Sequence, residues 1–269
     1  MSNISEIKKK INSISKLKKI TNVMKIIATS KINKYKQNFL QNSDFNDILF
    51  KIIKPIIQNT HIKENTNKKT LWVIFTSSLG MSGNYNINLF KQINENVKKD
   101  DKIILFGKKG INFIKGKDID ENILFSSSIS EKDFNFLWFT NLSKKVFFEY
   151  NKNNIGKISI IYTRIMPNKK IISTAEDIFP LKVGKEIDIN YNFEQNIEKI
   201  YKKAIIFFIH SMFYTAFIES KFCEQIARKN AMNDANENIS KTIDELKNQY
   251  NKKRQEKITN SIFKNIENE

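Results

Sequence analysis

The segment TSSLGMSGNYN, residues 76–86, contains residue types that could hold a phosphate group. It follows a short apolar run and precedes a helical stretch, the place where free backbone N–H groups bind phosphates. Its two glycines do not complete a dinucleotide-binding pattern, and it lacks the GK[ST] ending of a P-loop. The pattern favours a tight turn from strand to helix, with phosphate binding as the alternative. FGKKG, residues 106–110, repeats this layout after the next apolar run.

Other residue types that carry catalysis are few or dispersed. His61, His210 and the single cysteine, Cys223, are too few for a multi-cysteine metal site or an intramolecular disulfide, and Cys223 is interpreted as a packed apolar residue. Carboxylates recur along the C-terminal segment without converging on opposed walls, as a catalytic pair requires, so we expect a solvated or partner-facing helix surface. These carboxylates are Glu219, Glu224, Asp234, Glu237, Asp244 and Glu245. We expect no catalytic residue, no cofactor and no metal ion.

Glycine and proline divide the chain into three parts. All seven glycines lie between Gly80 and Gly184, and residues 185–269 contain neither glycine nor proline. Because these residues are the strongest breakers of regular structure, the two ends of the chain are predicted to be long helices around a compact middle.

The N-terminal segment carries the period of a coiled coil. Its stripe residues recur at steps of three and four, with Lys18 and Lys25 as polar interruptions and Leu17, Ile20, Met24 and Ile27 beside it. Pro55 is predicted to kink or end this helix. The stripe comprises Ile4, Ile7, Ile11, Ile14, Thr21, Ala28, Ile32, Tyr35 and Phe39.

The C-terminal segment carries a second stripe of the same kind. We expect its helix to begin near Asn192, with Gln195 completing a weak capping box, and to span on the order of 100 Å. AIIFFI, residues 204–209, is apolar all round and is expected to pack on the middle domain. The stripe comprises Met232, Ala235, Ile239, Ile243, Leu246 and Tyr250, extended by Ile258, Ile262 and Ile266.

The middle of the chain alternates strand-like and helix-like segments. LWVIFT (71–76), KIILFG (102–107) and KISIIYT (157–163) are rich in β-branched and aromatic residues, and they alternate with helical stretches at 86–98 and 131–151. This rhythm predicts a largely parallel sheet. The predicted fold class is therefore α/β, with a long antiparallel two-helix coiled coil from the N- and C-terminal segments and an inserted Rossmann-like α/β domain. The predicted domains are residues 1–60, 70–185 and 192–269, the first and last of which pair.

A formal net charge of +18 normally indicates nucleic acid, an anionic membrane or an acidic protein partner. Only three of the 46 basic residues are arginines, and isoleucine and asparagine are abundant, which is typical of an AT-rich coding sequence. The charge is therefore discounted as evidence for nucleic-acid binding. The start, MSNISEIKKK, lacks the apolar run of a secretory signal, and no stretch approaches the roughly 18 apolar residues of a spanning helix, so a soluble intracellular protein is expected.

Both terminal segments resemble a known family. EIKKKINSISKLKKITNVMKIIATSKINK, residues 6–34, looks like the N-terminal helix of ATP synthase gamma subunits, and ESKFCEQIARKNAMNDANENISKTIDELKNQYNKKRQEKITNSI, residues 219–262, resembles their C-terminal signature. TSSLGMSGNYN is similar to that family's TSDRGLCGGYN. The resemblance implies a non-catalytic rotor shaft of an F-type proton-translocating ATP synthase, which couples rotation of a membrane c-ring to conformational change at the catalytic beta subunits.

The resemblance also implies partners and contact residues. The partners are three alpha and three beta subunits, an epsilon subunit and the c-ring, with the membrane contacted only through that ring. No nucleic acid is implied. The location implied is peripheral, on the cytoplasmic face of a bacterial inner membrane. Contacts to beta are expected at Met24, Lys25, Arg228, Met232, Arg254, Gln255 and Thr259, and contacts to the c-ring or epsilon at Tyr191, Phe193 and Glu194.

Two alternatives stay open. The charge and the long helices together also fit a basic coiled-coil protein that binds nucleic acid, which predicts steeply salt-dependent binding to DNA or RNA. A small α/β enzyme with helical extensions is the other alternative, and it requires a cleft in the middle domain.

Overall fold

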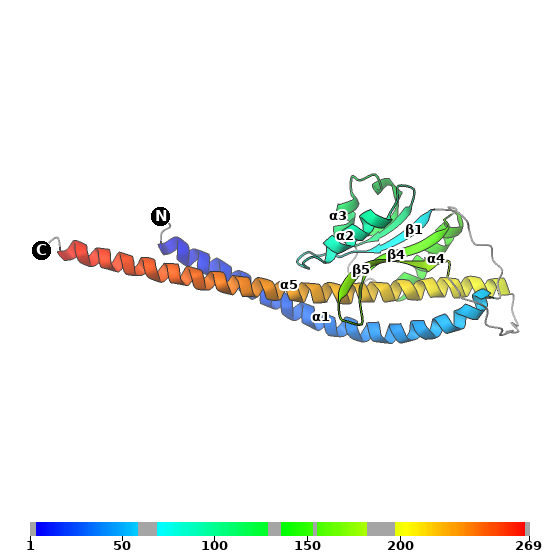
Figure 1. Ribbon diagram of the computed structural model, residues 1–269, viewed down its shortest axis with the longest axis horizontal. Helices are drawn as coiled ribbons and strands as arrows, with labels where there is room; N and C mark the ends of the chain where they lie inside the picture. Colours follow the sequence, from blue (N-terminus) through cyan, green and yellow to red (C-terminus); the bar gives the residue numbers. More distant parts are fainter. Residues whose placement is uncertain (1–3, 59–68, 129–135, 153–154, 182–196, 267–269) are drawn as a thin grey trace. The chain divides into compact units, whose positions relative to one another are not determined.

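The computed structural model describes residues 4–58, 69–128, 136–152, 155–181 and 197–266. The chain divides into two compact units, each described by itself. The helical unit comprises Met1–Ser30 with Arg228–Glu269, and the sheet unit comprises Lys31–Ala227. Helix α1 (Ile4–Gln58) and helix α5 (Ile197–Ile266) contribute residues to both units (Figure 1).

The sheet unit is built on one sheet of five described strands, in the order β3-β2-β1-β4-β5. Strands β1 (Thr70–Phe75), β2 (Lys102–Phe106) and β4 (Lys157–Ile165) are those predicted from the sequence. The sequence did not predict β3 (Ile123–Ser127) or β5 (Ile171–Phe179). Neighbouring strands from β3 to β4 run parallel and β5 runs antiparallel to β4, which confirms a largely parallel sheet.

Helices cover both faces of this sheet (Figure 1). Along β1, Leu71, Val73 and Phe75 pack into a core with α4 (Phe136–Lys152), α1 and α5. Trp72 and Ile74 pack into a second core with α2 (Tyr85–Asn96) and α3 (Lys108–Ile114). This alternation follows from the two-residue period of a strand, and full burial of β1 on both faces explains why residues 71–75, LWVIF, include no charged or hydroxyl side chain.

Within the sheet unit, α1 and α5 lie antiparallel. Phe39 stacks on Phe222 at 6.3 Å between ring centroids. Further along α1, Asn46 donates to Thr215 at 2.8 Å, and Phe50 packs on Phe208 at 6.4 Å between centroids. Because residue numbers rise along one helix as they fall along the other, the two helices run in opposite directions.

The AIIFFI segment of α5 packs in the sheet unit largely as expected. Ile205, Phe208 and Ile209 are buried in the first core, while Phe207 stays exposed. Pro55 was predicted to kink or end the N-terminal helix. It does not end it, because α1 continues through Pro55 to Gln58. The predicted start of the C-terminal helix, at Asn192 and Gln195, lies outside the described residues.

The helical unit contains much of the two predicted stripes. Ile32, Tyr35 and Phe39 belong to the sheet unit, and the predicted extension of the second stripe is wrong at Ile258 and Ile262, which are exposed. On α1, Ile7 and Ala28 are buried and Ile11, Ile14, Lys18 and Lys25 are half-buried. On α5, Met232, Ile243 and Leu246 are buried and Tyr250 is half-buried. Thr21 of α1 bonds to Asn236 of α5, and the Asn236 amide donates to Asn22 at 2.8 Å. With the sheet unit, this pairing confirms the predicted fold class.

Candidate functional site

Helix α5 crosses the carboxyl ends of the parallel strands. In open α/β sheets a ligand binds outside those ends, at the point where the strand order reverses. Here that point lies between β1 and β4. Glu219, Ser220 and Lys221 of α5 occupy it, and we call the contacts that they make there the α5–sheet junction.

Ser220 connects α5 to two other elements. The hydroxyl group of Tyr85, on α2, lies 2.8 Å from Ser220 Oγ and donates to the Ser220 carbonyl oxygen at 3.1 Å. The backbone N–H of Thr163, near the end of β4, donates to Ser220 Oγ at 3.5 Å. Tyr85, Thr163 and Ser220 are all buried, so these bonds are shielded from water.

Glu219 adds a charged contact at the end of β4. Its Oε1 accepts a hydrogen bond of 2.9 Å from the backbone N–H of Ile165. Burial raises the pKa of the Glu219 carboxyl to about 7; the Ile165 N–H and Arg164 oppose the rise, and Glu176 adds to it. Arg164 pairs with Glu176, which also accepts a hydrogen bond of 3.1 Å from the Tyr162 hydroxyl.

Lys221 and Glu224 form a buried ion pair within α5, with 2.8 Å between Nζ and Oε2. Cys223, between them, is fully buried in the second core. Burial, with the charge of Glu219, raises the pKa of its thiol. The expectation of a solvated or partner-facing surface is therefore wrong for Glu219 and Glu224, because α2 and the strand ends meet this part of the helix.

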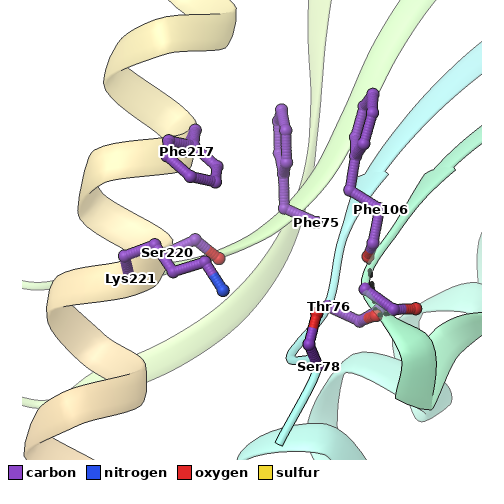
Figure 2. Close-up of a pocket in the computed structure, with 8 residues that line it drawn as sticks. Phe75, Thr76, Ser78, Phe106, Phe217, Ser220 and Lys221 are labelled. Atoms are coloured by element: carbon purple, nitrogen blue, oxygen red, sulfur yellow. Dashed lines mark hydrogen bonds between the residues drawn. The ribbon is translucent and has the colours of Figure 1, made fainter. Parts of the chain in front are cut away.

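Figure 2 shows the small space that remains at the junction. Phe217, Ser220 and Lys221 face the ends of β1 and β2, represented by Phe75, Thr76, Ser78 and Phe106. The cavity measures about 10 Å³, on the scale of one water molecule. It is too small for a phosphate group, so α5 fills the place that a nucleotide would need.

The loop after β1 is closed by its own hydrogen bonds. Thr76 Oγ1 donates to the Phe106 carbonyl oxygen at 2.7 Å and accepts from the Gly110 N–H at 3.0 Å. The N–H of Ser77 donates to Asn86 Oδ1 at 3.3 Å. These contacts fit the tight turn predicted from the sequence, since the N–H groups of Ser77 and Gly110 are already bonded to side chains of residues 76–86.

The expected contact residues differ in exposure. Arg228 and Met232 are buried, at 7% and 4% exposed, and Met24 and Lys25 are half-buried. Arg254, Gln255 and Thr259 are exposed on α5. Tyr191, Phe193 and Glu194 lie outside the described residues. His61 lies outside them too, and the described residues contain no group of three or more His, Cys, Asp or Glu placed to hold a metal ion.

The helical unit also exposes large apolar side chains in two groups. The first lies on α1, where about half or more of each side chain is exposed; we call it the α1 patch, and it comprises Leu17, Ile20, Val23, Ile26 and Ile27. The second lies near the end of α5; we call it the α5 end patch, and it comprises Ile258, Ile262 and Phe263. Contiguous exposed apolar surface is typical of a contact with another protein.

Comparison with known proteins identifies the family. A family model described as ATP synthase matches residues 3–265. The ATP synthase gamma chain of Malacoplasma penetrans (strain HF-2) is 31% identical over 276 residues, covering 97% of this chain and 96% of that protein. The chain belongs to the ATP synthase gamma-chain family. The gamma chain of Mycoplasmopsis pulmonis (strain UAB CTIP) is also 31% identical, with 97% of each chain covered.

Solved structures share the fold of this chain. The rotor of the Euglena gracilis mitochondrial ATP synthase, in rotational state 1, matches with a TM-score of 0.70 at 17% identity, covering 95% of this chain and 98% of that chain. A central stalk and c-ring structure from Tetrahymena thermophila matches with a TM-score of 0.65 at 19% identity, covering 80% and 99%. Among the described residues of this gamma-family chain, no helix combines the length and apolarity needed to cross a membrane.

Reasoning from the sequence missed several residues of the junction. Tyr85 and Thr163 lie in separate elements, and nothing in their spacing indicates that they meet Ser220. One signal was present: the polar triplet ESK, residues 219–221, directly follows a strongly apolar stretch of a helix without a breaker. Polar residues inside such a helix are buried only when partners bond to them, so the triplet itself indicated a bonded contact.

Proposed function

We propose that this chain is the central rotor shaft of an F-type proton-translocating ATP synthase. One observation carries the proposal: the paired helices of the helical unit leave the α1 patch and the α5 end patch exposed. A shaft inside a ring of other subunits needs such surfaces, because its partners rather than its own core cover them. Family membership supports the same conclusion.

The shaft works by differential contact. The helical unit lies in the central cavity of three alternating alpha and beta subunits, and the sheet unit binds the epsilon subunit and the c-ring. Proton flow turns the ring, and the asymmetric shaft presents a different face to each beta subunit in turn. Each beta subunit changes conformation because the shaft binds its alternative states unequally. The chain itself acts as a non-catalytic subunit.

Contact residues belong to the same proposal. Arg254, Gln255 and Thr259 are exposed and are proposed to touch the beta subunits directly, with Arg254 suited to bidentate bonding of carboxylates or carbonyl oxygens. Met24 and Lys25 are proposed as contacts through their half-exposed surface. Arg228 and Met232 offer little surface, so their proposed contribution is to shape the helix pair beneath a contact.

The remaining expectations also stand as proposals. Tyr191, Phe193 and Glu194 are proposed to contact the c-ring or epsilon, and residues 1–60, 70–185 and 192–269 are proposed as the domains. The complex is proposed to lie at the cytoplasmic face of a bacterial inner membrane, which this chain reaches only through the c-ring.

Reconstitution tests the proposed function. The chain is mixed with alpha and beta subunits, and ATP hydrolysis is compared with and without it. We expect a stable complex and sustained hydrolysis only when the chain is present. A complex of alpha and beta with the same activity in its absence would overturn the proposal. Gel-shift titration of the chain with DNA and RNA, at two salt concentrations, tests the nucleic-acid alternative, which nothing in the comparisons supports.

A further inference from the structure

We propose that Glu219 and Ser220 form the joint that transmits torque between the sheet unit and helix α5. This inference rests on the proposed rotor function and assigns the positioning residues that the function requires. A shaft driven from its base does work only if the base cannot slip around it, so the contacts between the sheet layers and α5 must resist rotation about the helix axis.

Apolar packing alone provides weak resistance of this kind. Ile205, Ile209, Phe213 and Phe217 of α5 pack in the first core, but apolar burial is non-directional and does not define one angle of the helix. Hydrogen bonds have preferred lengths and angles, so a small rotation of the helix lengthens or misaligns them.

The two joint residues hold the helix from two directions. Glu219 accepts from Ile165 at the end of β4, and Ser220 bonds to Tyr85 of α2. Consecutive residues of an α-helix point about 100° apart around its axis. A rotation in either direction therefore strains at least one of the two contacts.

Burial strengthens this restraint. Glu219, Ser220 and Tyr85 are each at most 5% exposed, so water cannot easily replace a broken bond. A buried polar group left without its partner is costly, which penalises any rotated position of α5. Helix α5 continues without interruption from the joint to Ile266.

The structure supplies a matched control. Tyr85 and Tyr162 are equally buried, at 5% exposed, and each hydroxyl group makes a hydrogen bond. The Tyr85 hydroxyl bonds to α5, whereas the Tyr162 hydroxyl bonds to Glu176 within the sheet. Tyr85→Phe and Tyr162→Phe thus remove the same atom from similarly buried side chains, but only the first removes a hydrogen bond to α5.

The test uses the complete ATP synthase in sealed membrane vesicles and measures protons pumped per ATP hydrolysed. Tyr85→Phe combined with Ser220→Ala removes the bonds of the Tyr85 hydroxyl and of the Thr163 N–H to Ser220. We expect hydrolysis to persist while the ratio falls below the wild-type value, because the loss of these buried bonds makes a slipped position of α5 about fivefold or more easier to reach. Tyr162→Phe keeps the wild-type ratio. Ser220→Thr, which retains a hydroxyl group, restores the ratio when Tyr85 is present.

Each outcome decides the question. A wild-type ratio in the double variant overturns the joint, as does an equal fall in Tyr162→Phe. If the double variant fails to assemble, Tyr85→Phe alone, which keeps every carbon atom, carries the same comparison. Failure of the rotor function is distinguishable, because in that case the wild-type chain itself supports neither assembly nor pumping.

Discussion

At the residue scale, the single thiol offers a direct test of the packing between α5 and the sheet unit. Cys223 is 0% exposed, and burial raises the pKa of its thiol. Only the thiolate reacts readily, so we expect native Cys223 to resist Ellman's reagent and to react fully after denaturation in guanidinium. Thiol titration of the native protein and of the denatured protein measures the two extents of reaction. Thr259→Cys is the control, since its exposed thiol should add one rapidly reacting equivalent; rapid reaction of native Cys223 itself contradicts the packing.

Glu219 predicts a dependence of stability on pH. The folded carboxyl has a pKa of about 7 against 4.5 for its ordinary value, so the folded state holds the extra proton between those values. The free energy of unfolding therefore falls as pH rises through this interval. Glu219→Gln stays neutral and can still accept from Ile165, so its stability should vary less and exceed that of the wild type at pH 8 by about 2–3 kcal/mol.

Urea denaturation of the wild type and of Glu219→Gln, at pH 5 and at pH 8, measures the free energy of unfolding of each protein. The difference between the free energies of unfolding of the two proteins excludes the contribution of the other titrating groups, which both proteins share. Glu237→Gln is a suitable control, because Glu237 is an exposed carboxylate of the same helix. Equal pH dependence of Glu219→Gln and the wild type would exclude the assigned role of burial at this carboxyl.

Cys223, Glu219 and Glu224 also show which features of single residues the sequence predicts and which it does not. Cys223 was correctly interpreted as a packed residue, because a lone cysteine has few other uses. Glu219 and Glu224 were misjudged, because the helix pattern around them does not indicate which side α2 and the strand ends cover. Burial of a charge depends on partners distant in the sequence, and one sequence does not identify them.

At the element scale, the coiled-coil stripes were predictable and the edge strands were not. The stripes repeat over many turns, so each position reinforces the same helical phase. Strand β3 is five residues long with a Ser-Ser end, and β5 mixes Ser, Thr, Glu and Asp with apolar residues. Such short or half-polar strands depend on pairing with a neighbour, which local sequence does not reveal.

Replacement by alanine is expected to reduce the stability of the chain by different amounts at Gly107 and at Gly116. Gly107 has φ of 100°, and a Cβ there would overlap the backbone carbonyl of Thr76. Gly116 has φ of 77°, but no atom lies within 4 Å of a Cβ there. We expect Gly107→Ala to destabilise the chain by about 2–5 kcal/mol and Gly116→Ala by about 1–2 kcal/mol. Thermal unfolding measures both, and equal costs would show that the contact with Thr76 is unimportant.

At the scale of the whole molecule, substitution of exposed apolar residues is expected to weaken assembly with other subunits more than it changes the stability of the isolated chain. Ile258 and Ile262 are 48% and 54% exposed, so changing both to serine should alter the unfolding of the isolated chain by less than about 1 kcal/mol. If the alpha and beta subunits cover them, the same change should weaken the complex by about tenfold or more, because two buried apolar side chains are lost. Calorimetry measures the unfolding of the isolated chain, and sedimentation measures the affinity of the complex.

Ile243→Ser provides the opposite case. Ile243 is 8% exposed within the helical unit, so its loss should lower the stability of the isolated chain by about 2–4 kcal/mol. The proposed arrangement is contradicted if the exposed pair affects folding more than assembly. The comparison separates a side chain that holds the helices together from side chains reserved for a partner.

The net charge of the chain was a poorer guide to its function than the positions of glycine and proline along the sequence. A charge of +18 suggested nucleic acid, yet the family is one of motor subunits. Net charge describes the field around a protein and does not determine its fold or its partner. The confinement of glycine to the middle of the chain, with neither glycine nor proline after Gly184, was more informative, because it limits where long helices can form.

The uninterrupted course of α5 constrains how this chain can change length. Inserting one residue into a helix advances every later side chain by about 100°, so the stripe beyond the insertion no longer faces its partner. Inserting seven residues shifts the phase by only about 20°. Since α1 pairs with α5, a tolerated extension must appear in both helices. Viable gamma-family chains should therefore differ in coil length by whole heptads, gained or lost as matched pairs.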